Sequence, residues 1–421
     1  MITKWIPVTQ VTPLIQFQRN EKYAGLRASE VKPALDNFLF QYFAKDKHWN
    51  YREKFVLENE NHFDILVDKG AALAGYSSMN ESKKFQALKH LAFDYKLRII
   101  ANKEIELKDV DEKTIPVYFA DLGKSEKHIE SFCAEYFFQV SSYSIELIEK
   151  IFDLLPRFLA ENNFGMRKAK GLGSFQVHQK EPCIPDNYIT FFKASNDVKL
   201  IFKSINLLSR AIRGGINEKG SYMKPLIFKY YKDKGFQWEK KTIKEEFYSR
   251  ELADDKTKHS LDAYSDQDSP LFYESNKKLL IRDVLGLSSK QAWNERYNND
   301  TISKENFDKA NTELYTQGGI KRISSCLYFK PLRKDETIIY IIEKTHLSQL
   351  NEDEKWFRIS KTIDSHLGVI DLKLPKSFEL KQLFNYLENE EFSLEELTNG
   401  LKGDYKKIID ILNECKKNLK K

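Results

Sequence analysis

The segment from Gly165 to Phe175 constrains the fold more than any other part of this chain. It reads Gly-Met-Arg-Lys-Ala-Lys-Gly-Leu-Gly-Ser-Phe, and it joins an amphipathic helix to an alternating strand. Glycine takes positive φ angles and lets the backbone approach a ligand closely. Exposed amides beside fixed cations suit a phosphodiester. The segment therefore supplies candidate RNA-binding residues: Gly165, Arg167, Lys168, Lys170, Gly171 and Gly173.

The order of elements around this loop excludes the two common nucleotide-binding loops. A P-loop has four residues between its glycines and continues Gly-Lys-Ser/Thr, whereas Gly171-Leu-Gly173 continues Ser174-Phe175. A dinucleotide fingerprint follows a strand and opens a helix. Here the helix comes first and the strand follows, so the loop needs another explanation.

Residues 1 to about 190 predict a ferredoxin-like domain. Residues 5–17 alternate as a strand, and Ser29 is a suitable N-cap for a helix with apolar residues at i, i+3 and i+4. Strands are expected at 95–107 and 135–140, and a second helix begins near Ser144. With the final strand, this gives the β-α-β-β-α-β order, with an insertion after the first helix.

The second half predicts a more divergent unit of the same kind. A helix at 200–212 ends in Arg213-Gly-Gly, a long polar stretch covers 216–312, and strands are expected at 323–329 and 337–342. The end of the chain is helical. The predicted fold class is therefore α+β, with tandem ferredoxin-like (RRM-like) domains at 1–190 and 191–375, insertions in both, and a helical C-terminal extension at 376–421.

Three stretches together resemble the RAMP superfamily, the RNA-binding subunits of CRISPR effector complexes. They are the glycine loop, the segment Val11–Leu14 with Gly25–Lys32, and Lys321–Pro331, although Cys326 stands where this family often has proline. The resemblance also supports the assignment of the ferredoxin-like fold, and it implies a type III, Cmr-like effector subunit of the two-domain capping kind. It implies CRISPR RNA, possibly target RNA, and other effector subunits as partners. It adds the candidate RNA-binding residues Arg27, Ser29, Lys32, Lys321, Arg322, Ser324 and Ser325.

Each candidate has a structural alternative. Glycines often end helices, so the loop can be a C-cap with solvated cations. Arg27, Ser29 and Lys32 can be an ordinary helix start, although a helix N-terminus also attracts phosphate. The stretch 222–241 interleaves aromatic and basic residues, which fits either base stacking or a helix that buries its aromatic face.

Composition allows RNA binding without requiring it. The 421 residues carry a net charge of +6 and a pI near 8.7. The four cysteines form no C-x-x-C pair and no zinc-ligand spacing with histidine, so we expect no metal site and no small-molecule cofactor. No signal peptide and no apolar stretch of membrane-spanning length is recognisable, so the sequence predicts a cytoplasmic protein.

Catalysis has little support in the sequence. Of eight histidines, only His48 comes directly after the first helix, where processing nucleases of the resembled superfamily often place a general acid–base histidine. Asp64 and Asp68 are weak candidates for a slicing aspartate. A subunit without strong catalysis is the leading hypothesis. A metal-independent endoribonuclease that processes CRISPR repeat RNA and a protein–protein adaptor remain the alternatives.

Overall fold

The computed structural model of the 421-residue chain describes the protein over seventeen stretches. They are residues 1–15, 25–43, 66–68, 71–72, 91–109, 129–178, 181–218, 221–236, 279–286, 292–294, 309–311, 324–344, 356–363, 366–375, 378–389, 393–394 and 403–420. The chain divides into two compact units. The first contains 1–188, 193–203 and 329–340, and the second contains 189–192, 204–328 and 341–421.

The first unit is built on a four-stranded antiparallel sheet. Its strands are β1 (Ile2–Gln10), β6 (Lys96–Ala101), β9 (Glu135–Ser142) and β10 (Phe175–Val177), in the order β10-β1-β9-β6. Helix α1 (Ala28–Phe43) lies between β1 and β6 in sequence, and α4 (Ile145–Glu161) lies between β9 and β10. Numbered along the chain, the four strands have the order 4-1-3-2 with helices after the first and third, which confirms the predicted ferredoxin-like order.

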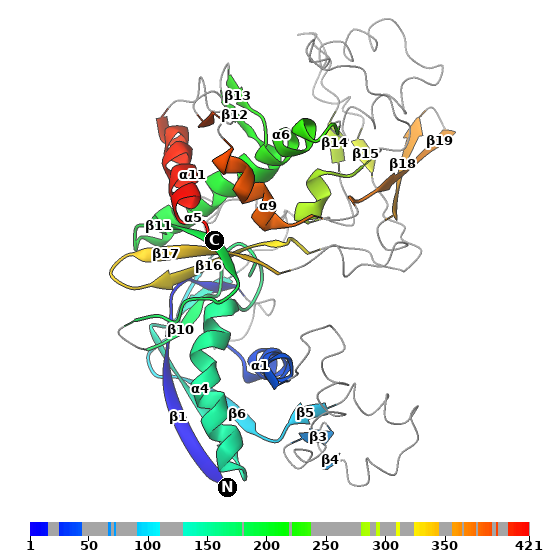
Figure 1. Cartoon of the computed structure of the whole chain (residues 1–421). Coiled ribbons are helices and arrows are strands. Elements are labelled where there is room, and N and C mark those ends of the chain that lie inside the picture. The colour runs from blue at the N-terminus through cyan, green and yellow to red at the C-terminus, as the bar shows by residue number, and fades with distance from the viewer. Residues whose placement is uncertain are drawn as a thin grey trace, which may run out of the picture. The chain divides into compact units, whose positions relative to one another are not determined.

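Helices α1 and α4 pack against one face of this sheet (Figure 1). Side chains alternate between the two faces of a strand, so Val8, Tyr136, Phe138 and Val140 enter the core while their neighbours point away. Helix α4 begins at the N-cap Ser144, whose Oγ accepts from the Leu147 amide at 3.2 Å. Its apolar residues then repeat at helical spacing and are buried.

Smaller sheets complete the first unit. One has the order β2-β8-β7, formed by β2 (Leu14–Ile15), β7 (Glu106–Asp109) and β8 (Ile129–Phe132). Another has the order β4-β3-β5, formed by β3 (Leu66–Asp68), β4 (Ala71–Ala72) and β5 (Leu91–Phe93). The latter lies between α1 and β6 in sequence, where the insertion was predicted.

A three-stranded sheet follows, in the order β11-β17-β16, from β11 (Tyr188–Ala194), β16 (Leu327–Arg333) and β17 (Thr337–Glu343). Helix α5 (Val198–Ser209) follows β11, so these strands match the first three of a ferredoxin-like order. The Lys420 amide also donates to the Ile189 carbonyl at 2.8 Å. The end of the chain thereby bonds to β11. In a ferredoxin-like order, the fourth strand would lie at this position, beside the first.

The remaining elements belong to the second unit. The helices are η4 (Arg210–Gly214, π-helical), α6 (Leu226–Asp233), η5 (Arg282–Leu285), α9 (Leu380–Asn385), η8 (Tyr386–Glu388), η9 (Gly403–Lys406) and α11 (Lys407–Lys417). The strands are β12 (Ile216–Glu218), β13 (Ser221–Met223), β14 (Ala292–Asn294), β15 (Lys309–Asn311), β18 (Trp356–Ile363) and β19 (His366–Lys373). Helical elements at 380–388 and 403–417 fit the predicted helical end, while the predicted boundaries at 190 and 375 stay predictions.

Several sequence expectations were wrong in detail. The strand expected at 323–329 begins only at Leu327 and extends to Arg333. Ser29 is not the N-cap, because α1 already begins at Ala28 and the Arg27 carbonyl accepts from the Glu30 and Val31 amides, both at 3.1 Å. The strand expected at 95–107 ends at Ala101 and resumes at Glu106, with Asn102 and Lys103 exposed between the two pieces.

Candidate nucleic-acid interface

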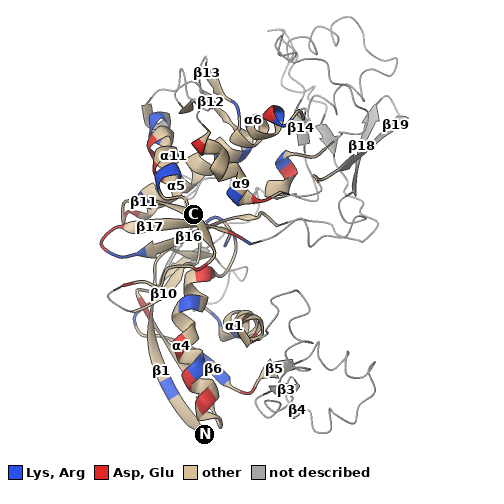
Figure 2. Ribbon diagram, in the orientation of Figure 1, with Lys and Arg blue, Asp and Glu red and all other residues tan. Residues whose placement is uncertain are grey.

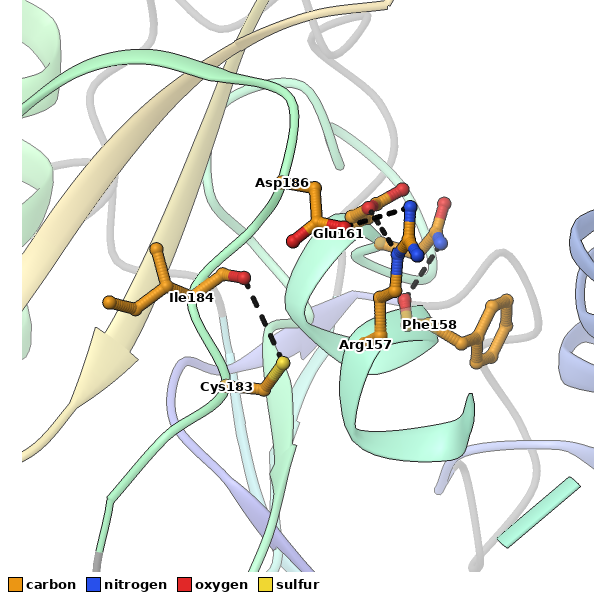
Figure 3. Close-up of polar contacts among 7 residues, drawn as sticks. Arg157, Phe158, Glu161, Cys183, Ile184 and Asp186 are labelled. Carbon is orange, nitrogen blue, oxygen red and sulfur yellow. Dashed lines mark hydrogen bonds and ion pairs between the residues drawn. The ribbon is translucent and has the colours of Figure 1, made fainter. Parts of the chain in front are cut away.

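The end of α4 is held in place before the glycine loop begins. Arg157 Nη2 lies 2.9 Å from Asp186 Oδ2, and its Nε lies 3.5 Å from Glu161 Oε1 (Figure 3). One turn later, Asn162 Nδ2 donates to the Phe158 carbonyl at 2.8 Å. These contacts fix the point from which the loop departs.

Cys183 lies beside this ion pair in Figure 3, with Sγ 3.8 Å from the Ile184 carbonyl oxygen. Burial raises the pKa of its thiol, and the Asp186 carboxylate raises it further, while Arg157 opposes both effects. A thiol with a raised pKa is a poor nucleophile, because the thiolate is the reactive form. Cys183 therefore gives no support to covalent catalysis at this end of the helix.

The loop amides are largely occupied by the protein itself. The Gly165 amide donates to Glu30 Oε1 at 2.5 Å, and the Met166 amide donates to the Ile15 carbonyl at 2.8 Å. The Glu30 carboxylate, in the first turn of α1, therefore binds the Gly165 amide, which the sequence analysis had treated as a candidate phosphate-binding group. The close approach that Gly165 permits is to the chain's own backbone: a Cβ there would lie 2.6 Å from the Ile15 oxygen.

Gly173 is required by internal packing in the same way. Its φ is +63°, and a Cβ at this position would lie 2.0 Å from the Phe164 carbonyl oxygen and 3.0 Å from Leu14 Cδ1. Its amide donates to the Pro13 carbonyl at 2.8 Å, and its carbonyl accepts from the Phe164 amide at 2.9 Å. The contact with Phe164 therefore predicts a large loss of stability for a valine at this position.

Thr12, two residues after β1, binds the second half of the loop through hydrogen bonds. Its side chain is fully buried, its Oγ1 donates to the Gly171 carbonyl at 2.7 Å, and the same oxygen accepts from the Ser174 amide at 2.9 Å. The Val11 amide also donates to the Ser174 carbonyl, at 2.8 Å. The start of the chain and the loop therefore fold as one piece.

Strand β16 supports the loop from the other side, through residues of the first unit. The Phe329 amide donates to the Ala169 carbonyl at 3.1 Å, and Asn163 Nδ2 donates to the Phe329 carbonyl at 2.8 Å. Lys330 is fully buried, and its Nζ donates to the carbonyls of Asn162 and Phe175 at 2.8 and 3.1 Å. This lysine was not recognised from sequence. Its position inside a continuous apolar strand was the available signal.

The three cations lie where the loop turns. The Lys170 amide donates to the Arg167 carbonyl at 2.8 Å, and the Gly171 amide donates to the Lys168 carbonyl at 3.2 Å. Lys168 is exposed, whereas Arg167 and Lys170 are half-buried, and Lys170 Nζ lies 5.9 Å from the Phe329 ring centroid. Arg167 has φ of 55°, a conformation that costs a non-glycine residue energy and persists where its surroundings impose it.

At the start of α1, the predicted residues have different environments. Ser29 is exposed. Lys32 Nζ is 2.9 Å from Asp36 Oδ2 and 3.2 Å from the Phe93 carbonyl, and it lies 4.1 Å from the centroid of the Tyr95 ring. These contacts give Lys32 a structural role. Arg27 is half-buried and supplies the carbonyl that begins the helix.

The second predicted basic segment is described only in part. Lys321 and Arg322 lie outside the described residues. Ser324 is exposed, and Ser325 turns its Oγ to the Leu327 amide at 3.2 Å, which caps the start of β16. Ser325 therefore has a local structural role.

The structure gives no site geometry for the catalytic candidates. His48 and Asp64 lie outside the described residues, and Asp68 is described only as the last residue of β3. Within the described stretches, no group of three or more His, Cys, Asp or Glu side chains is arranged to hold a metal ion. No described helix is long and apolar enough to cross a bilayer.

The aromatic and basic stretch of the second unit has its tyrosines inside. Tyr230 and Tyr231 on α6 are 5% and 4% exposed, and their rings meet edge to face at 5.2 Å. Burial raises the pKa of Tyr231 well above its ordinary value. Helix α6 therefore buries its aromatic face. Tyr222 is 46% exposed, and Trp238 lies outside the described residues.

The fold and the loop define a class of protein. A ferredoxin-like order, with a second helix that leads through a basic glycine loop into the last strand, is the arrangement expected of a RAMP protein. Family models identify the family: the Cmr1 N-terminal domain model matches residues 1–216, and the Cmr1 C-terminal domain model matches residues 222–417. The chain belongs to the Cmr1 family, which confirms the resemblance to Cmr-type RAMP proteins of CRISPR systems.

The comparison with solved structures finds a remote similarity. The crystal structure of Cmr1 from Pyrococcus furiosus, in its apo form, shares 10% sequence identity with this chain and has a TM-score of 0.35. The match covers 82% of this chain and 89% of that one. A search of curated proteins finds no match.

Proposed function

We propose that this chain is an RNA-binding subunit of a type III-like CRISPR ribonucleoprotein effector complex, acting in antiviral defence in the cytoplasm. It contacts the phosphates of guide RNA, or of the guide–target duplex, and leaves sequence reading to base pairing. Membership of the Cmr1 family supports the effector-subunit part of this proposal. The RNA contact rests on the glycine loop.

The observation that carries the RNA contact is the fixed geometry of a basic turn. Hydrogen bonds to Pro13, Ile15, Glu30 and Phe329 hold the loop on both sides of residues 167–170. A preformed cationic turn loses little conformational freedom when it binds. Since the amides of Gly165, Met166 and Gly173 already donate internally, we assign the phosphate contacts to side chains of Arg167, Lys168 and Lys170.

The salt dependence of RNA binding tests this assignment. Replacing Arg167, Lys168 and Lys170 together by alanine should weaken binding of CRISPR RNA by about 10-fold or more at moderate salt. It should also flatten the plot of log K against log salt by about two to three units of slope, because fewer counterions are released. Fluorescence anisotropy at several salt concentrations measures both.

A matched variant removes the same charge elsewhere. Its three positions are exposed lysines outside the loop: Lys199, Lys381 and Lys417. If only net charge matters, the two triple variants will lose equal affinity and equal slope, which would reject the loop as the site. If the loop is the site, the control variant keeps most of both.

A further inference from the structure

The face of the first-unit sheet opposite α1 and α4 carries a pattern that the glycine loop does not explain. At its β10 edge this face is covered by β16, where Gln176 bonds the backbone of Arg333 at 2.9 and 2.8 Å. Helices α1 and α4 pack on one face, and the side chains between the core residues point to the other. On β1, the side chain of Trp5 is 49% exposed, whereas Val8, on the opposite face of the same strand, is buried in the core. A large aromatic residue at the centre of a sheet, turned away from the core, calls for an explanation.

The strand register places this face in rows that run across β1, β9 and β6. One row contains Trp5, Gln139 and Arg98, and the next row on the same face contains Pro7, Phe137 and Ile100. The Trp5 and Phe137 rings meet edge to face, with centroids 6.2 Å apart and an interplanar angle of 82°. Phe137 therefore fixes the indole of Trp5 and leaves about half of its surface open.

The charge around this aromatic pair is positive. Lys96 and Arg98 are exposed on β6, which carries blue segments in Figure 2. Arg98 lies in the same row as Trp5, and Lys96 lies one row away. Of the carboxylates near this face, Glu135 lies at the far end of β9, where it accepts from Asn102 Nδ2 at 2.8 Å, and Asp94 lies just before β6 and is half-buried. The end of the sheet that holds Trp5 thus combines an aromatic surface with two cations.

We propose that this face is a stacking platform for one or two unpaired bases of single-stranded RNA, with Arg98 and Lys96 neutralising the adjoining phosphates. An aromatic ring offers a surface to any base, and nearby cations hold the backbone. An aromatic pair on the two central strands of a four-stranded sheet is a common way to hold single-stranded RNA. The inference extends the proposed function, on which it rests, to a second surface of the same unit.

Equilibrium binding of an oligouridine of about twelve nucleotides to the full-length protein tests the platform. Trp5→Ala should weaken binding about five-fold or more, and Trp5→Phe should restore most of the affinity, because a phenyl ring still stacks. Arg98→Ala should reduce the salt slope by about one unit. Tyr143→Ala is the matched control, since Tyr143 is a 79% exposed aromatic residue beyond the end of β9, and its loss should change nothing.

The outcomes separate this inference from the proposed function. If the triple loop variant loses affinity while Trp5→Ala binds like the parent protein, the loop function stands and the platform is rejected. If the parent protein binds neither oligouridine nor CRISPR RNA, both proposals fail. If Trp5→Ala leaves RNA affinity intact but abolishes recovery of a protein subunit in co-purification, the face is a protein interface and the inference is wrong. Unchanged melting temperatures confirm that the variants fold.

Discussion

Replacement of Gly173 by alanine tests the view that the loop glycines serve internal packing. The new Cβ would lie 2.0 Å from the Phe164 carbonyl oxygen, so either that carbonyl or the loop must move. The φ of +63° adds about 1 kcal/mol for any L side chain. The movement also breaks both buried bonds of Gly173, to Phe164 and to Pro13, at about 1 kcal/mol each. The sum is about 3 kcal/mol.

Differential scanning calorimetry measures this loss. For a unit of this size, about 3 kcal/mol lowers the melting temperature by about 6–12 °C. Gly235→Ala is the matched control, because Gly235 also has a positive φ, +80°, but nothing lies within 4 Å of the added Cβ. It bears the backbone cost alone, so we expect a shift of about 2–4 °C. Equal shifts for the two variants would refute the steric argument and reopen direct ligand contact at Gly173.

Three further predictions concern the loop, its support at Thr12, and strand β17. Thr12→Val should destabilise the protein by about 2 kcal/mol in urea unfolding, because the bonds to Gly171 and Ser174 lose their partner, and Thr12→Ser should restore most of it. Arg167→Gly should be more stable than Arg167→Ala by about 1 kcal/mol, since glycine accepts the φ of 55°, while both lose the same RNA affinity. Burial raises the pKa of Tyr340 from 10.0 to about 12, so its stabilising contribution is complete below pH 10 and disappears as pH rises through 12. Tyr340→Phe should therefore flatten the pH dependence of unfolding in that range.

The sequence predicted the first unit well because its signals are local. Helix α4 has a serine N-cap and an unbroken apolar repeat, and β9 alternates cleanly, so both elements were placed within two residues or so. The element order, together with the resemblance to RAMP proteins, then indicated the ferredoxin-like topology. The start of α1 was misplaced because serine is a preferred N-cap, whereas the helix already begins at Ala28, with the Arg27 carbonyl accepting the first amides.

The role of the glycines could not be predicted from the loop alone. A positive φ and a close approach look the same in a sequence whether the neighbour is a phosphate or the chain's own carbonyl. Here the neighbours of Gly165 and Gly173 are Ile15 and Phe164. The aromatic surface on β1 and β9 was missed for a similar reason. Trp5 and Phe137 are more than a hundred residues apart, and only the strand register places them on one face.

The most direct test of the account is the fate of labelled CRISPR repeat RNA mixed with the purified chain, once with Mg²⁺ and once with EDTA. The account predicts that the RNA is retained by the protein and keeps its full length under both conditions. Cleavage at one position in EDTA, lost in His48→Ala, would instead identify a processing endoribonuclease. Cleavage that requires Mg²⁺ and is lost on changing Asp64 or Asp68 would identify a slicing subunit. Failure to retain any RNA would contradict the central claim and favour a protein–protein adaptor.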